Sequence, residues 1–226
     1  MITRQLLWTL ALLGCALSSQ AVTLDKNFAG NPNFKDTVLP GTTAVARPEL
    51  SGTVLEDQMQ SITFAGLSFT IQNRVVRETT SGTLDFYWRI RDISPSGATT
   101  SPPGALSAFR LGNFGYASIV DADWRSDSDG TVGPSSARVF NPLMNPSGDI
   151  NFLFSPTTVG LSDESTFFFL HTDATSYART AVYDLLADAQ LSGPFMTFAP
   201  AVPELQTWLL MAGGLLALGW IKRRQS

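Results

Sequence analysis

Runs in which apolar and polar residues alternate dominate the middle of the chain. In the clearest run, residues 83–93, every second side chain from Leu84 to Ile90 is apolar. The polar positions between and after them are Asp85, Tyr87, Arg89 and Arg91. Because successive side chains of a β-strand point to opposite faces of a sheet, the pattern predicts a strand with its apolar set in a core and its polar set in water.

Further short runs rich in aromatic and β-branched residues are separated by clusters of Ser, Gly, Pro, Asn and Asp. The runs begin at Ser61, Ala108, Ala137, Ile150 and Thr166, and the turn clusters begin at Ser94, Arg125 and Asn141. Short strands separated by such turns are typical of two packed antiparallel sheets. We therefore expect an all-β domain over residues 22–201, with a β-sandwich or jelly-roll architecture.

Two segments of this domain have a less definite pattern. The stretch from Ser176 is rich in Ala and Leu, which favour a helix, yet its residues Val182 to Leu191 also fit a pair of strands. The segment Val22 to Pro48, with its Asn, Gly and Pro residues, is interpreted as a loosely held N-terminal arm.

The first 21 residues have the three parts of a secretory signal peptide. Arg4 supplies a positive charge, residues 6–17 form an apolar stretch, and Ser19-Gln20-Ala21 resembles a cleavage site with small residues. We expect cleavage after Ala21. The sequence LLGC at residues 12–15 resembles a bacterial lipobox, so the alternative is a lipoprotein anchored through Cys15.

Processing at Ala21 would change both the chemistry and the charge of the chain. Cys15 is the only cysteine, so the mature protein would form neither an intramolecular disulfide nor a thiolate metal site. Residues 22–201 carry 11 Lys and Arg against 18 Asp and Glu, a formal charge of −7. An acidic domain of this kind is a poor candidate for binding nucleic acid, whose affinity depends on neutralised phosphates.

The C-terminal end has the pattern of a membrane helix with a basic tip. Residues 205–221 form an uncharged, mostly apolar run that would span about 26 Å as a helix, close to the thickness of a bilayer core. Tryptophans lie near both ends of the run, where indoles favour the membrane interface. The basic residues Lys222, Arg223 and Arg224 follow at once, as expected of a cytoplasmic flank.

Residues 202–226 together resemble the PEP-CTERM sorting tail of Gram-negative bacteria. The matching parts are the motif Val202, Pro203 and Glu204, the helix from Leu205, and the basic tip. The resemblance implies recognition by exosortase and an association with bacteria that make exopolysaccharide. It departs from the family at Leu205, where the motif has a second proline, and this puts the efficiency of processing in question. Residues 165–185 also resemble a segment of the β-rich domains that precede such tails, which favours strand there.

Two polar groups are candidates for chemical activity. The sole histidine, His171, follows an apolar run and has no nucleophile motif beside it, so we interpret it as a structural residue and expect no enzyme activity. The richest acidic cluster is made of Asp121, Asp123, Asp127 and Asp129. Alternating aspartates before a glycine can gather oxygen ligands for Ca²⁺, but the EF-hand spacing is not met. A solvated acidic turn and a calcium site stay open as alternatives, with no other cofactor expected.

Aromatic residues offer a third kind of site, because rings present apolar faces to sugars. The candidates for such a sugar-stacking surface are Tyr87, Trp88, Phe114, Tyr116 and Trp124. Of these, only Tyr87 is expected on a solvent-exposed strand face.

These observations predict a non-enzymatic exported protein. The signal peptide takes it through the inner membrane, and the C-terminal helix holds it there as a single-pass protein with a cytoplasmic C-terminus. As the resemblance implies, exosortase then transfers the β-domain to the cell surface or the exopolysaccharide matrix. The alternative function is an extracellular carbohydrate-binding or carbohydrate-active protein.

Overall fold

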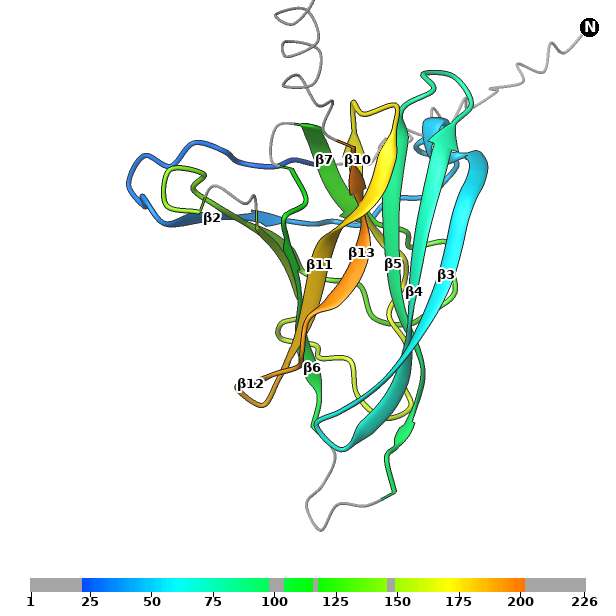
Figure 1. Ribbon diagram of the computed structural model, residues 1–226, viewed down its shortest axis with the longest axis vertical. Helices are drawn as coiled ribbons and strands as arrows, with labels where there is room; N and C mark the ends of the chain where they lie inside the picture. Colours follow the sequence, from blue (N-terminus) through cyan, green and yellow to red (C-terminus); the bar gives the residue numbers. More distant parts are fainter. Residues whose placement is uncertain (1–21, 98–103, 116–117, 146–148, 202–226) are drawn as a thin grey trace, which may run out of the picture.

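The computed structural model describes residues 22–97, 104–115, 118–145 and 149–201. These residues form two antiparallel sheets that face each other, as the sequence predicts (Figure 1). Sheet A contains, in spatial order, β1 (Val22–Thr23), β7 (Ile119–Trp124), β10 (Phe168–Thr172), β5 (Leu84–Pro95), β4 (Leu67–Glu78) and β3 (Gly52–Phe64). The expectation of an all-β, two-sheet domain is therefore confirmed.

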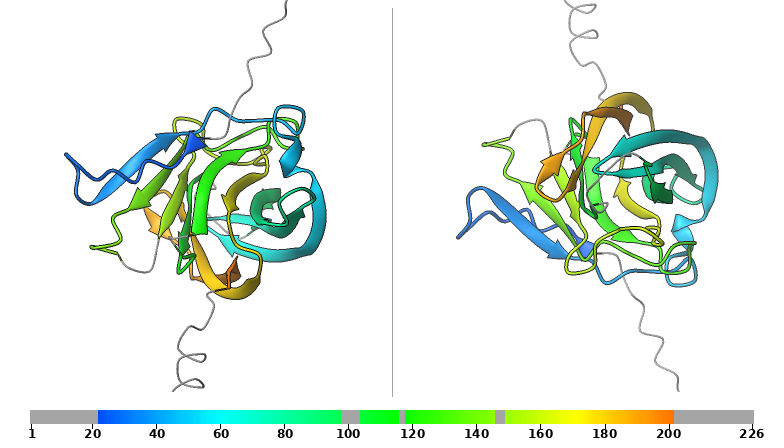
Figure 2. Two further views of the ribbon diagram at one scale, coloured as in Figure 1. Left: turned by 90° about the horizontal axis from the view of Figure 1, so that it is seen from above. Right: turned by 90° about the horizontal axis from the view of Figure 1, so that it is seen from below.

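Sheet B is built from the shorter strands and the last part of the domain. Its order is β12 (Gln190–Leu191), β11 (Tyr177–Ala187), β6 (Leu106–Gly112), β9 (Ile150–Leu153), β8 (Ser136–Phe140) and β2 (Phe34–Val38). A further strand, β13 (Phe195–Pro200), pairs with β11. In the two end-on views of Figure 2, the blue strand β2 and the cyan strand β3 lie on opposite sides of the molecule.

The segment from Ser176 forms strand β11, so the strand alternative holds and the helix alternative does not. The interpretation of residues 22–48 as a loosely held arm is wrong. β1 pairs with β7 in sheet A, and β2 pairs with β8 in sheet B along its full length. Leu24 and Leu39 are buried in the main core, with 2% and 4% exposure.

The core between the sheets is an aromatic cluster centred on Trp88. Its ring lies within 6.2 Å, centroid to centroid, of four phenylalanine rings: Phe109, Phe114, Phe152 and Phe168. The apolar set of the 83–93 run therefore packs inward, as its alternation predicts.

The indole N–H group of Trp88 also has a hydrogen-bond partner inside the core. Its indole Nε1 donates a 2.9 Å hydrogen bond to Oγ1 of Thr197 on β13, and this hydroxyl donates to Oδ1 of Asn73 on β4 at 3.0 Å. Both sheets are thus joined by one buried chain of hydrogen bonds, since buried polar groups need partners.

The prediction that the other face of β5 lies in water is wrong. Asp85, Tyr87 and Arg89 are only 0%, 4% and 5% exposed. Two segments cover this outer face of sheet A: residues 39–51, which contain the short 3₁₀ helix η1 (Pro48–Leu50), and the loop at residues 125–129. Sheet A is therefore buried on both faces around β5 and β10.

We predict that Phe168→Ala lowers the free energy of unfolding by about 3–5 kcal/mol, because it empties the centre of the aromatic cluster. Phe168 is fully buried and its ring lies 4.8 Å from that of Phe152. Urea unfolding of the full-length chain measures the loss. Val45→Ala is the control, since Val45 is 90% exposed and its truncation should change stability by no more than about 0.5 kcal/mol. Equal effects of the two substitutions would contradict this account of the core.

Candidate functional site

The outer face of sheet A gathers charged side chains from neighbouring strands. His171 on β10 lies directly opposite Asp85 on β5 and Asp121 on β7 in the strand registers. Residues directly opposite each other in an antiparallel pair project to the same face at about 4.5–5.5 Å. The topology therefore places one histidine between two carboxylates, although 86 residues separate His171 from Asp85.

The segment at residues 39–51 reaches this face by passing the edge of β7. Gly41 has a φ of +82° and runs so close to Trp124 that a Cβ atom there would lie 2.5 Å from the ring. The backbone nitrogen of Thr42 donates to the carbonyl oxygen of Trp124 at 2.8 Å. A glycine is therefore required at position 41 by both its conformation and its close approach.

The end of this segment forms a second, smaller hydrophobic cluster on the outer face. Leu50, in η1, packs with Val76 of β4, Tyr87 of β5 and Phe169 of β10, and all four are at least 94% buried. The cluster fixes the segment over the sheet, because apolar area is removed from water on both sides of the contact.

Arg47 fastens the same segment through charge. Its Nη1 and Nη2 donate to the two carboxylate oxygens of Asp121 at 3.1 and 3.3 Å, and its Nε donates to Glu49 at 2.7 Å. The guanidinium also lies over the ring of Phe169, 5.6 Å from its centroid. Arg47 is 6% exposed, so its guanidinium interacts with protein groups and hardly with solvent.

Next to this pair lies a cluster of two buried carboxylates and the imidazole. The Nδ1 atom of His171 is 2.7 Å from Oδ1 of Asp85 and 3.2 Å from Oε1 of Glu78. Glu78, at the end of β4, is 3% exposed and Asp85 is fully buried. The other oxygen of Glu78 accepts hydrogen bonds from the hydroxyls of Ser81 and Thr83 in the following turn.

Burial raises the pKa of Asp85 to about 6, against the opposing effect of its hydrogen bond with His171. Burial by itself lowers the pKa of His171, but its hydrogen bond with Asp85 and the charges of Asp85, Asp121 and Glu78 raise that pKa above its usual value. Both shifts have one cause: negative charge is concentrated where water is excluded.

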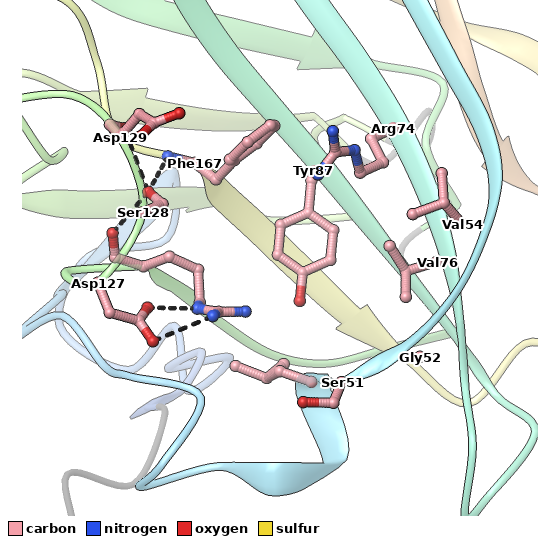
Figure 3. Close-up of a pocket in the computed structure, with 12 residues that line it drawn as sticks. Ser51, Gly52, Val54, Arg74, Val76, Tyr87, Asp127, Ser128, Asp129 and Phe167 are labelled. Carbon is pink, nitrogen blue, oxygen red and sulfur yellow. Dashed lines mark hydrogen bonds and ion pairs between the residues drawn. The ribbon is translucent and has the colours of Figure 1, made fainter.

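Beside the cluster, the outer face opens into a pocket of about 460 Å³. Figure 3 shows the Tyr87 ring in the middle of this pocket, with Phe167 and Arg74 at one end and Asp127 to one side. Arg74 stacks on the Phe167 ring at 4.6 Å and donates to Asp57 at 2.7 Å. The pocket thus combines aromatic surface with charged groups that already hold ionic partners.

The phenol oxygen of Tyr87 is buried without a hydrogen-bond partner among the described residues. Burial and the charge of Asp85 raise the pKa of this phenol well above its usual value, while the nearby Arg125 acts in the opposite direction. Tyr87 is therefore a neutral, polar group at the floor of the pocket rather than an exposed ring on a strand face.

The four aspartates considered for calcium are separated by their partners. Asp121 binds Arg47, Asp127 binds Arg125 at 2.7 Å, and Asp129 binds Arg89 at 3.2 Å. Asp123 is fully buried, with one oxygen accepting from the backbone nitrogens of Gly41 and Trp124. Among the described residues they form no common ligand group, because three of them pair with different arginines: Asp121 and Asp129 with distant ones, and Asp127 with its neighbour Arg125.

The aromatic residues considered for sugar stacking also separate. Trp88 and Phe114 lie in the core, and Trp124 is half-buried with its indole donating to the carbonyl oxygen of Leu39. Tyr116 lies outside the described residues. Phe167 was missed by the sequence analysis, since its place in an apolar run indicated only a strand.

Glu78 and Asp85 were likewise not singled out as partners of His171. Asp85 lies in the alternating run at residues 83–93, and the alternation predicted that its side chain faces solvent. The residues of the predicted sorting motif, Val202, Pro203 and Glu204, lie outside the described residues. The basic tip and the signal peptide lie outside them as well. Within the described ranges, no helix is long and apolar enough to cross a membrane.

The fold and this covered outer face define a two-sheet antiparallel β-protein with a buried polar site on sheet A. Comparison of the chain with protein-family models, curated proteins and solved structures finds no match.

We predict that Arg47→Met destabilises the protein by about 3–5 kcal/mol, because it leaves the Asp121 carboxylate buried without a counter-charge. Arg138→Met is the matched control: Arg138 also makes a two-point contact with an aspartate, Asp36, but on the surface, and should cost about 0–1 kcal/mol. Urea unfolding compares the two variants.

The double variant Arg47→Met with Asp121→Leu should recover much of this loss, because it removes both buried charges. No recovery would mean that the packing of Arg47 on Phe169, and not the ion pair, holds the segment in place.

Proposed function

We propose that this protein is an exported, non-enzymatic component of the cell envelope or extracellular matrix, sorted by an exosortase through residues 202–226. The observation that carries the proposal is the position of the folded unit. Strand β1 begins at Val22, immediately after the predicted signal peptide, and β13 ends at Pro200, immediately before the tail motif. The described domain therefore fits between the two segments that sequence reasoning assigned to processing.

The boundary before the tail is well anchored. The backbone nitrogen of Ala201 donates to the carbonyl oxygen of Ser176 at 2.9 Å, and Pro200 lies opposite Tyr177 in the β13–β11 pair. Cleavage near Glu204 would leave this pairing intact, since it removes only residues beyond the last strand. The signal and membrane helices, and a jelly-roll form of the sandwich, remain predictions within this proposal.

The composition of the domain is compatible with a role outside the cytoplasm. Residues 22–201 contain no cysteine, and their aromatic core supplies stability without disulfides. Such a domain folds the same way in reducing and oxidising compartments, because no thiol chemistry is involved. In the proposed route, the chain crosses the inner membrane, is held by its C-terminal helix, and is released or transferred to the surface or polysaccharide matrix.

We predict that the envelope form of the protein lacks residues 1–21 and the tail from about Glu204 onward. Intact mass spectrometry of the protein from its native bacterium measures this, with cells lacking exosortase as the comparison. The mutant cells should retain the tail. The variant Pro203→Ala, Glu204→Gln should retain it in wild-type cells as well, because the recognised motif is altered while the helix and basic tip are kept.

Two other masses would contradict this route. A tail retained in both strains would show that Leu205 prevents processing, leaving a single-pass membrane protein. A mature N-terminus at Cys15 that carries fatty-acid mass would show the lipoprotein alternative, and Cys15→Ser should then abolish that mass.

A second candidate function is carbohydrate binding, and the pocket beside Tyr87 is the observation that favours it. The half-buried Phe167 ring and the rim residues Arg125, Asp127 and Ser128 combine an apolar face with hydrogen-bonding groups. Sugar sites use this combination, because rings contact the apolar C–H groups and polar side chains bind the hydroxyls.

We predict for this candidate that Phe167→Ala lowers the affinity for the bacterium's own exopolysaccharide at least about tenfold. Phe34→Ala is the control, since Phe34 is also stacked by an arginine, Arg138, at 3.9 Å, but lies outside the pocket. Tyr87→Phe should leave binding unchanged, because the hydroxyl that it removes is buried. Calorimetry measures the affinities. Equal binding by the wild type and all three variants would refute the pocket as the sugar site.

A further inference from the structure

We propose that Glu78, Asp85 and His171 form a binding site for one divalent transition-metal ion of the zinc class. The site would take Nδ1 of His171 and one oxygen from each carboxylate as its protein ligands. This inference is independent of exosortase sorting and of the carbohydrate pocket, because it rests on a different set of side chains.

The three ligand atoms are already close together. Nδ1 of His171, a carboxylate oxygen of Glu78 and one of Asp85 all lie within 4.8 Å of one another. Zinc–ligand bonds of about 2.0–2.2 Å place neighbouring ligand atoms about 3–3.5 Å apart. The observed separations of 2.7 and 3.2 Å from Nδ1 therefore need only a small opening to admit an ion.

Two buried oxygen atoms in the cluster have no hydrogen-bond partner. They are Oε1 of Glu78 and Oδ2 of Asp85, on side chains that are at least 97% buried. A buried carboxylate oxygen without a partner is costly, since its desolvation is not compensated. Coordination to a cation would give Oε1 of Glu78 a partner and would compensate the buried charge of both carboxylates.

The charges around the cluster leave room for a divalent ion. Arg47, whose charge acts on Asp85, is itself engaged by Asp121 and Glu49. Glu78 and Asp85 are left with the hydroxyls of the adjacent turn and one imidazole. Two buried negative charges and a neutral histidine match the +2 charge of a metal ion, whereas a protonated histidine compensates only one of them.

The donor atoms and the scaffold favour a zinc-class ion over calcium. One imidazole nitrogen with two carboxylate oxygens is a ligand set that zinc-class ions accept in three-ligand sites, whereas Ca²⁺ requires six to eight oxygens. The ligands come from β4, β5 and β10, which are adjacent strands, so their backbones are fixed before the ion arrives. The His171 side chain keeps 16% exposure and offers the side from which an ion can approach.

The test uses the full-length chain in detergent, freed of metal with a chelator and titrated with Zn²⁺. We expect one ion per chain by calorimetry, with a dissociation constant in the micromolar range or below. At about 100 times that concentration, the melting temperature should rise by about 5–10 °C. X-ray absorption at the zinc edge should show a shell of nitrogen and oxygen, including an imidazole, and no sulfur.

The variants His171→Gln, Asp85→Asn and Glu78→Gln should each weaken Zn²⁺ binding at least tenfold. Asp123→Asn is the matched control, because Asp123 is an equally buried carboxylate on β7 outside the cluster. It should bind Zn²⁺ as the wild type does. Near-UV circular dichroism establishes that each variant is folded.

Each remaining outcome overturns the site. A folded wild type that binds no Zn²⁺ would show that the cluster is a buried histidine–carboxylate ion pair. Wild-type affinity in folded His171→Gln would place the ion elsewhere. If the variants do not fold, the zinc-edge spectrum of the wild type decides: a shell without an imidazole contradicts the assignment, since His171 is the only histidine.

Discussion

The guanidinium of Arg47 lies over the outer face of sheet A, where it binds both oxygens of Asp121 and stacks on Phe169. This contact brings the segment at residues 39–51 across the sheet and seats Leu50 on its small hydrophobic cluster. A sheet that would otherwise have one wet face becomes the middle layer of the molecule. The burial of Asp85, His171 and Tyr87 all follows from this cover.

Covering a polar face buries charged side chains, and only some of these charges are neutralised by a partner. Arg47, Arg89 and Arg125 each neutralise acidic residues that the fold brings near them. Burial raises the pKa of Asp123 to about 6, although two backbone nitrogens bind its carboxylate, and Glu78 and Asp85 share one imidazole. Sites where a buried negative charge is not fully neutralised are candidates for ligand binding, because an unpaired buried carboxylate gains most from a bound cation or proton.

The alternation in residues 83–93 predicted the inner face of β5 correctly, since hydrophobic periodicity is a local property of the chain. It could not predict the cover on the other face, because residues 39–51 have no periodic pattern of their own. For the same local reason, the acidic stretch at 121–129 was interpreted either as a solvated turn or as a calcium site. In the structure Asp121 and Asp129 pair with the distant residues Arg47 and Arg89, which the fold brings to them, whereas Asp127 pairs with its neighbour Arg125. The sequence pattern placed His171 at the end of a strand, but it did not identify Glu78 and Asp85 as its partners.

Residues 22–201 contain no cysteine, so the cluster of Glu78, Asp85 and His171 could have the structural role that a disulfide has in other domains. A bound metal can hold distant segments of a domain together without a disulfide. Glu78, Asp85 and His171 lie at the ends of β4 and β10 and at the start of β5, next to the turns that connect them. An ion there would tie three adjacent strands at one point, close to where Arg47 already fastens the covering segment. The same few side chains would then decide both whether the outer face stays closed and how firmly sheet A is held at that end.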